Sequence, residues 1–297
     1  MKPLLPWSGN SRIMVYSFSF IVLLAGFQYI AWEGQTSDVT VLNLEGAPGG
    51  IVYIADPHVR AGNYDHTWKI VDEINRLHPS VVLIGGDFEF GNGEEDLELQ
   101  DVWSGIDAPV YAVLGNHDYH VGIKGSGYEG RICWLLESVL RSNGYDTRAF
   151  CTADPDMDHA GRLVEVLERN GVHVLRNEVV ELTLDGRKTT IVGVDDMWAG
   201  LDNPPVVPES DSYVIYLVHE PEYKKDWNAD LVLAGHTHGG QFNVAGIQLI
   251  NTLGLIDIYG LTHKGDVPLF VSRGIGTSNF EQEYRFMASP EIVLINP

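Results

Sequence analysis

Short apolar runs recur along the chain from residue 50 onward, and several of them end in polar side chains. Each has the length of a buried strand. Between the first two runs, residues 65–78 carry apolar side chains at helical spacing, and residues 160–170 do so again. The alternation predicts an α/β fold with a buried sheet. Strands are expected at residues 50–55, 80–84, 109–114, 172–175, 179–184, 189–194, 213–218, 230–234, 241–250, 268–273 and 291–295.

Residues 119–158 interrupt this alternation and are predicted to form a cap-like insertion. Part of the segment has the periodicity of an amphipathic helix. Two interpretations stay open: the apolar face packs on the domain, or it meets a lipid chain or the membrane. The face consists of Ile132, Leu135, Leu136, Val139 and Leu140.

The N-terminal region has the character of a membrane segment. Residues 13–32 carry no charge, and their number is about that needed to cross a bilayer as a helix. Basic residues precede the segment and acidic ones follow it, so the positive-inside rule places residues 1–12 in the cytoplasm and the remainder outside. We expect a transmembrane anchor at 13–32, a stalk at 33–49 and one globular domain at 50–297. A cleaved signal peptide is the alternative, but no Ala-x-Ala site follows.

The formal net charge of −22 argues against one class of partner. A nucleic-acid-binding protein uses a basic face to neutralise phosphates, so we expect no nucleic-acid partner. The two cysteines, Cys133 and Cys151, are too few for a disulfide scaffold. Both belong to the inserted segment, and whether they pair stays open.

Five of the predicted strands end in side chains that commonly bind metal ions. In α/β proteins, sites lie at the carboxyl ends of strands. Carboxylate and amide oxygens combined with imidazoles suit Mn, Fe or Zn. These candidate ligands are too many for one ion and suit two ions that share a carboxylate. The strand ends carry Asp56 and His58, then Asp87, then Asn116, His117 and Asp118, then His219, and finally His236 and His238.

Two metal ions about 3.5–4 Å apart are a known means of hydrolysing phosphoesters. The blocks Asp-x-His, Gly-Gly-Asp, Gly-Asn-His-Asp, His-Glu-Pro and Gly-His-Thr-His span residues 56–238. In this order they resemble the calcineurin-like metallophosphoesterases. The C-terminal part resembles the membrane-anchored bacterial phosphodiesterase branch, through Gly239-Gly240-Gln241, residues 271–277, Arg285-Phe286 and residues 290–292.

The resemblance implies two stacked mixed β-sheets flanked by helices, in four layers. It also implies two divalent metal ions (Mn, Fe or Zn) and attack on phosphorus by a metal-bound hydroxide. The family's motifs assign one metal ion to Asp56, His58 and His238 of this sequence. They assign the other ion to Asn116, His219 and His236, with Asp87 as the bridging ligand. His117 protonates the leaving oxygen or stabilises the phosphoryl group, and Asp118 fixes its orientation.

The favoured function is therefore a phosphodiesterase or phosphatase anchored at the outer face of the cytoplasmic membrane. The insertion at 119–158 is long for this branch, and in UDP-diacylglucosamine pyrophosphatases of the wider family a cap in this region holds acyl chains. Pyrophosphate cleavage of a nucleotide-linked lipid is thus the alternative, although the expected topology disfavours it. A non-catalytic metal-bearing module is a remote alternative, because every motif block is intact.

Overall fold

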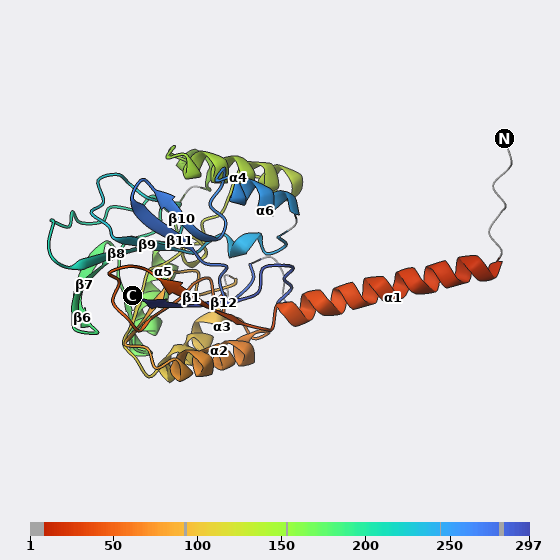
Figure 1. The fold of residues 1–297 in the computed structure, drawn as a ribbon, viewed down its shortest axis with the longest axis horizontal. Helices are drawn as coiled ribbons and strands as arrows, with labels where there is room; N and C mark the ends of the chain where they lie inside the picture. The colour runs from red at the N-terminus through yellow and green to blue at the C-terminus, as the bar shows by residue number, and fades with distance from the viewer. Residues whose placement is uncertain (1–8, 92–93, 153, 244, 279–281) are drawn as a thin grey trace.

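Two mixed six-stranded sheets form the body of the protein (Figure 1). The computed structural model describes residues 9–91, 94–152, 154–243, 245–278 and 282–297. The first sheet runs in the order β1 (Asp38–Asn43), β12 (Glu291–Asn296), β2 (Ile51–Ile54), β3 (Val81–Ile84), β4 (Val110–Ala112) and β5 (Val172–Val174). The second runs in the order β10 (Gly260–Lys264), β11 (Val267–Val271), β9 (Leu231–Ala234), β8 (Tyr213–Leu217), β7 (Arg187–Gly193) and β6 (Glu178–Leu184).

The sheets stack on one another, which confirms the predicted architecture. Tyr53 and Leu83 of the first sheet share one buried apolar cluster with Ile215 and Leu233 of the second. Because β2 and β3 are buried on both faces, their sequences are unbroken apolar runs rather than alternating ones.

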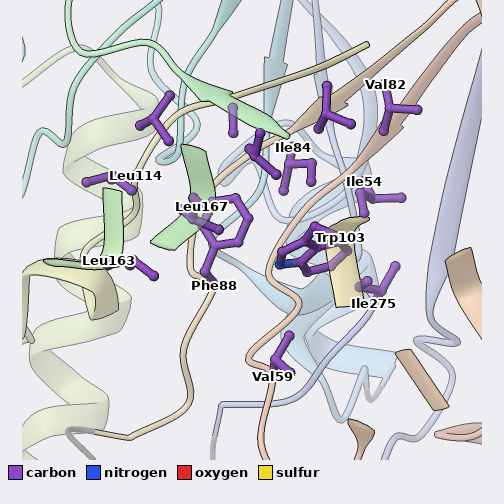
Figure 2. Close-up of a cluster of buried hydrophobic side chains, with 14 of the residues drawn as sticks. Ile54, Val59, Val82, Ile84, Phe88, Trp103, Leu114, Leu163, Leu167 and Ile275 are labelled. Carbon is purple, nitrogen blue, oxygen red and sulfur yellow. The ribbon is translucent and has the colours of Figure 1, made fainter. Parts of the chain in front are cut away.

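Helices cover the outer face of the first sheet (Figure 2). The strands β2 to β5 are parallel neighbours. The chain between them passes through α2 (Tyr64–Arg76), α3 (Glu94–Glu98), the 3₁₀ segment η1 (Leu99–Gly105) and α5 (Met157–Arg169). Ile54, Val82 and Ile84 meet Trp103 of η1 and Leu163 of α5 in a second cluster. Parallel strands joined this way bring their carboxyl ends to one edge of the sheet.

Two of the predicted elements are wrong. The expected stalk at 33–49 contains the edge strand β1, which pairs parallel with β12 from Asp38 opposite Glu291. The strand expected at 241–250 is instead a helix, α6 (Ala245–Thr252). A short segment with apolar residues fits a strand and a helix equally well, so the sequence pattern at 241–250 did not distinguish the two.

The inserted helix α4 (Gly127–Ser142) has its apolar face turned outward. Ile132 and Leu136 are 50% and 48% exposed. Its inward face instead buries an ion pair, with 2.8 Å between Arg141 Nε and Glu137 Oε1. The interpretation in which the apolar face packs on the domain is therefore wrong. Cys133 lies within α4 and Cys151 follows it in the same insertion, and both are free thiols.

Helix α1 (Gly9–Glu33) extends away from the body of the protein (Figure 1). Its stretch Met14–Glu33 is long and apolar enough to cross a membrane. Large side chains along it, such as Phe18 and Leu23, are exposed. A membrane anchor and a signal sequence both have this composition.

Candidate metal centre

The five polar strand ends identified in the sequence form loops that gather in one place. One set of donor atoms comes from Asp56, His58, Asp87 and His238, and these atoms all lie within 4.8 Å of one another. The two ring nitrogens His58 Nε2 and His238 Nε2 are 3.1 Å apart. Asp87 Oδ2 lies 3.4 Å from His58 Nε2. We call these four residues the first group.

A second group consists of Asp87, His219 and His236, with Asn116 beside them. The donor atoms of the three titratable residues again lie within 4.8 Å of one another. His236 Nδ1 is 3.2 Å from His219 Nε2 and 2.9 Å from Asn116 Oδ1. Asp87 Oδ2 is 3.2 Å from His219 Nε2. The same carboxylate oxygen of Asp87 therefore faces both groups.

Three of the histidines are held in one tautomer by the backbone. A carbonyl oxygen only accepts, so the Nδ1 atom beside it carries the hydrogen, and Nε2 turns a lone pair toward the site. The pairs are His58 Nδ1 with Glu89 O at 2.8 Å, His219 Nδ1 with Gly85 O at 2.7 Å and His238 Nδ1 with Gly276 O at 2.9 Å.

This arrangement fits a bound cation. With hydrogens on both Nδ1 atoms, His58 Nε2 and His238 Nε2 are two acceptors 3.1 Å apart, and a cation bound by both would satisfy them. Asp56 Oδ2 and His236 Nε2 are buried and have no hydrogen-bond partner among the described residues. Carboxylate, amide and imidazole donors together match Mn, Fe or Zn. The residues present thus suit the divalent ions that the sequence predicts.

Burial keeps most of these imidazoles in the neutral form that binds metals. It lowers the pKa of His58 to about 3 and holds the pKa values of His236 and His238 well below their usual range. His219 differs, because the Asp87 carboxylate outweighs the effect of burial and raises its pKa. Burial also raises the pKa of Asp56 to about 7. A cation at the site would counter both effects and favour ligation.

The ligand-bearing loops adopt a backbone conformation that is rare for non-glycine residues. Asp56, His58, Asp87, His236 and His238 have φ angles of 52°, 42°, 58°, 71° and 51°. Such left-handed residues concentrate at functional sites, where the surrounding structure holds them in place. His236 and His238 both lie in the loop after β9, but the ring of His238 belongs to the first group and that of His236 to the second.

Two glycines make room for the carboxylates. A Cβ atom on Gly115 would lie 2.4 Å from Asp87 Oδ1, and one on Gly235 would lie 2.6 Å from Asp56 Oδ2. Both distances are far below van der Waals contact. The glycines that precede Asn116 and His236 therefore allow the loops to approach this closely.

His117 lies beside the first group, half-buried, with its ring centroid 4.8 Å from that of His58. The sequence predicts that Asp118 orients this ring. The hydrogen bonds of the buried Asp118 carboxylate go instead to backbone N–H groups of two loops. They come from Asp87 at 3.0 Å, Phe88 at 2.8 Å, Glu89 at 3.3 Å and Gly115 at 2.9 Å. Asp118 thereby ties the loop after β3 to the loop after β4.

Several supporting residues were not found from the sequence. The Trp198 ring meets the His236 ring edge-to-face, with 4.4 Å between centroids. Its Nε1 donates to Glu137 Oε1 of α4 at 3.3 Å. The inserted helix thus reaches the second group through its polar inward face. Nothing local in the sequence signals this contact, because Trp198 and Glu137 are far apart in the chain.

Comparison with known proteins identifies the family. A model of the calcineurin-like phosphoesterases matches residues 50–240. The chain belongs to this family. The match confirms the predicted metallophosphoesterase class and hence a phosphoester hydrolase.

Individual relatives cover most of the chain. Phosphodiesterase YaeI of Escherichia coli is 27% identical over 260 residues, which cover 84% of this chain and 82% of that protein. The UDP-2,3-diacylglucosamine pyrophosphatase LpxG of Chlamydia muridarum is 26% identical over 287 residues, covering 82% of each. Among solved structures, the phosphopantetheinyl hydrolase of Mycobacterium tuberculosis aligns over 76% of this chain and 89% of its own, with 15% identity and a TM-score of 0.40.

Replacing Asp118 by asparagine separates its two candidate roles. The amide would turn N–H groups toward backbone donors, leaving buried groups unsatisfied at about 1–3 kcal/mol each. We expect Asp118→Asn to lower the unfolding temperature and the manganese affinity, while turnover at saturating manganese stays within about threefold of wild type. Thermal unfolding, metal titration and hydrolysis measured on one preparation check this. Unchanged stability and metal affinity with turnover lost at saturating metal would instead assign Asp118 to the orientation of His117.

Proposed function

We propose that this protein hydrolyses phosphodiesters or phosphomonoesters with two divalent metal ions, and manganese is the first to test. One observation carries the proposal: Asp87 Oδ2 lies 3.4 Å from a nitrogen of the first group and 3.2 Å from a nitrogen of the second. A single carboxylate oxygen between two sets of donors is the arrangement that a bridged metal pair needs. Family membership and the phosphodiesterase relative support the same reaction.

The two groups divide the ligands between the ions. One ion would be held by Asp56, His58 and His238. The other ion would be held by Asn116, His219 and His236, and Asp87 would bind both ions. When bound, such a pair supplies Lewis acidity that activates water and neutralises phosphate charge. The backbone carbonyls behind the imidazoles fix the ring orientations and strengthen the donors.

His117 is the proposed general acid. Its ring lies next to His58, yet it is not in either group of candidate ligands, and it is half-buried rather than enclosed. From there it can give a proton to the leaving oxygen of a substrate held at the two groups. Its own N–H donates to Asp87 Oδ1 at 2.9 Å, which fixes the backbone beneath the ring.

Hydrolysis of bis-p-nitrophenyl phosphate tests the proposal. The full chain in detergent should release p-nitrophenol when manganese is added. Loss of a general acid typically costs about 10²–10⁴-fold, so His117→Ala should reduce turnover by that order while metal content stays nearly intact. Asp87→Ala is the control that should lose metal and activity together. Absence of hydrolysis with every divalent metal tried would refute the enzyme, and metal loss in His117→Ala would reassign that residue.

We further propose that α1 anchors the catalytic domain at the outer face of the cytoplasmic membrane. Helix length and apolar composition support the anchor, and Lys2 and Arg12 support the orientation. An alkaline phosphatase reporter fused after Pro297 should therefore be active, and a green fluorescent protein fusion should be dark. The reverse pattern would put the domain in the cytoplasm and would favour a nucleotide-linked lipid as substrate.

A lipid-linked pyrophosphate is the second candidate substrate. The outward apolar face of α4 favours it, because the polar face of the same helix reaches the second group through Trp198. The LpxG relative, a UDP-2,3-diacylglucosamine pyrophosphatase by name, supports this candidate.

A charge on α4 should separate the two candidates. Leu136→Glu would place a carboxylate on a face that is 48% exposed, so folding should tolerate it. If acyl chains bind there, KM for UDP-2,3-diacylglucosamine should rise about tenfold or more, with bis-p-nitrophenyl phosphate hydrolysis unchanged. The matched control is Val206→Glu, because Val206 is 88% exposed and lies in a loop outside α4. Equal effects of Leu136→Glu on both substrates would exclude a lipid-specific role for α4.

A further inference from the structure

The end of α1 is docked onto one segment of the catalytic domain, residues 283–289. Glu33 is only 3% exposed, and its Oε1 accepts the N–H of Ala288 at 2.9 Å and the hydroxyl of Ser289 at 3.4 Å. The carbonyl of Ile30 accepts the N–H of Arg285 at 3.2 Å. The helix therefore joins the domain through specific buried contacts.

Aromatic pairs and a close backbone approach complete this junction. Phe27 meets Tyr284 and Tyr29 meets Phe286, both edge-to-face, with ring centroids 5.2 and 6.1 Å apart. A Cβ atom on Gly34 would lie 1.7 Å from the carbonyl oxygen of Glu283. Only glycine permits the chain leaving α1 to pass so near that segment.

Arg285 connects the docked segment to His238. Its guanidinium is completely buried and donates to the carbonyls of Arg273 at 2.7 Å, Gly274 at 3.2 Å and Gly276. The Gly276 carbonyl is also the acceptor for His238 Nδ1. Arg285 thus holds in place the carbonyl that sets the His238 tautomer.

The same loop is hydrogen-bonded to the strand that carries Asp56. The N–H of Ile275 donates to Ala55 O and that of Gly276 to Asp56 O, each at 2.9 Å. A Cβ atom on Gly276 would lie 2.1 Å from Pro57 O, which shows how closely the two loops are packed. Displacement of the loop held by Arg285 would therefore move Asp56 as well.

Glu283 makes the corresponding connection to His58. Its Oε1 accepts from Arg60 Nη2 at 2.6 Å and from Asn63 Nδ2 at 2.9 Å. Both donors also bind the carbonyl of His58, Arg60 through Nη1 at 3.0 Å and Asn63 at 3.1 Å. The docked segment therefore supports the backbone beneath every ligand of the first group except the shared Asp87.

The second group is supported mainly from other loops, apart from one link to the first group, in which the N–H of His236 donates to Asp56 Oδ1 at 2.8 Å. His219 is fixed by the Gly85 carbonyl, and Asn116 donates to Val121 O at 2.6 Å. His236 packs against Trp198. These contacts lie on loops after β3, β4 and β7, none of which belongs to the docked segment.

We infer that the end of α1 is a positioning element for the first metal group, acting through Glu283 and Arg285. Glu33 and Gly34 are positioning residues, since neither touches a candidate ligand. The inference rests on the proposed function in one respect, that the two groups bind metal ions. The inference adds that helix α1 sets the metal affinity of the first group. A disturbance at the junction should weaken the first group and spare the second.

Metal binding by the full chain in nanodiscs tests this inference, with manganese alone as the probe. Wild type should bind two ions. Gly34→Ala should weaken one site by about tenfold or more and leave the other within about twofold, because loss of outer supports typically costs 10–100-fold in metal affinity. Turnover at limiting manganese should fall, and saturating manganese should restore kcat, which a general loss of folded protein would not allow.

Substitutions of Glu33 provide a second route that avoids steric conflict. Glu33→Ala removes the acceptor for Ala288 and should reproduce the selective weakening, whereas Glu33→Gln keeps an acceptor oxygen and should restore binding. Glu45→Ala, at an exposed carboxylate of the same region, should match wild type. Two wild-type sites in both Gly34→Ala and Glu33→Ala, or equal weakening of the two sites, would overturn the inference alone. A wild-type chain that binds no manganese would overturn the proposed function along with it.

Discussion

The buried carboxylate of Asp87 governs the arrangement of the site. Its Oδ2 lies between imidazoles of two groups, and the neighbouring Nε2 atoms of His58 and His238, both without a hydrogen, are 3.1 Å apart. Such a collection of acceptors is unfavourable in a buried place unless cations share it. The requirement for positive charge explains why all of these donors gather in one place, at the ends of the strands. It also explains why one carboxylate oxygen of Asp56 has no hydrogen-bond partner among the residues described.

Holding these donors together requires support from outside the two groups. Backbone carbonyls set the tautomers of three histidines. Asp118 accepts hydrogen bonds from N–H groups of two loops, and Arg285 donates to carbonyls of a third loop. Left-handed backbone at five ligands is stable only within such a frame. Preorganisation of this kind removes the cost of ordering the ligands when an ion binds. The end of α1 belongs to the frame, since it is docked on the segment that contains Arg285.

Much of the fold and most of the site were predictable because their signals are local. Apolar runs of strand length end in Asp56 and Asp87, so the parallel pairing of β2 with β3 alone brings these two residues to one edge. His219 follows β8 of the second sheet, and it joins them because the two sheets stack. Features that depend on distant contacts were not predictable. The strand β1 exists because β12, far along the chain, pairs with it. The outward apolar face of α4 and the backbone contacts of Asp118 likewise depend on partners that sequence spacing does not identify.

The central claim is that two divalent ions share Asp87, and anomalous diffraction from manganese-loaded crystals tests it most directly. The account predicts two anomalous peaks about 3.5–4 Å apart, on either side of Asp87 Oδ2, one beside His58 and His238 and the other beside His219 and His236. A single peak, or a pair that Asp87 does not contact, would contradict it.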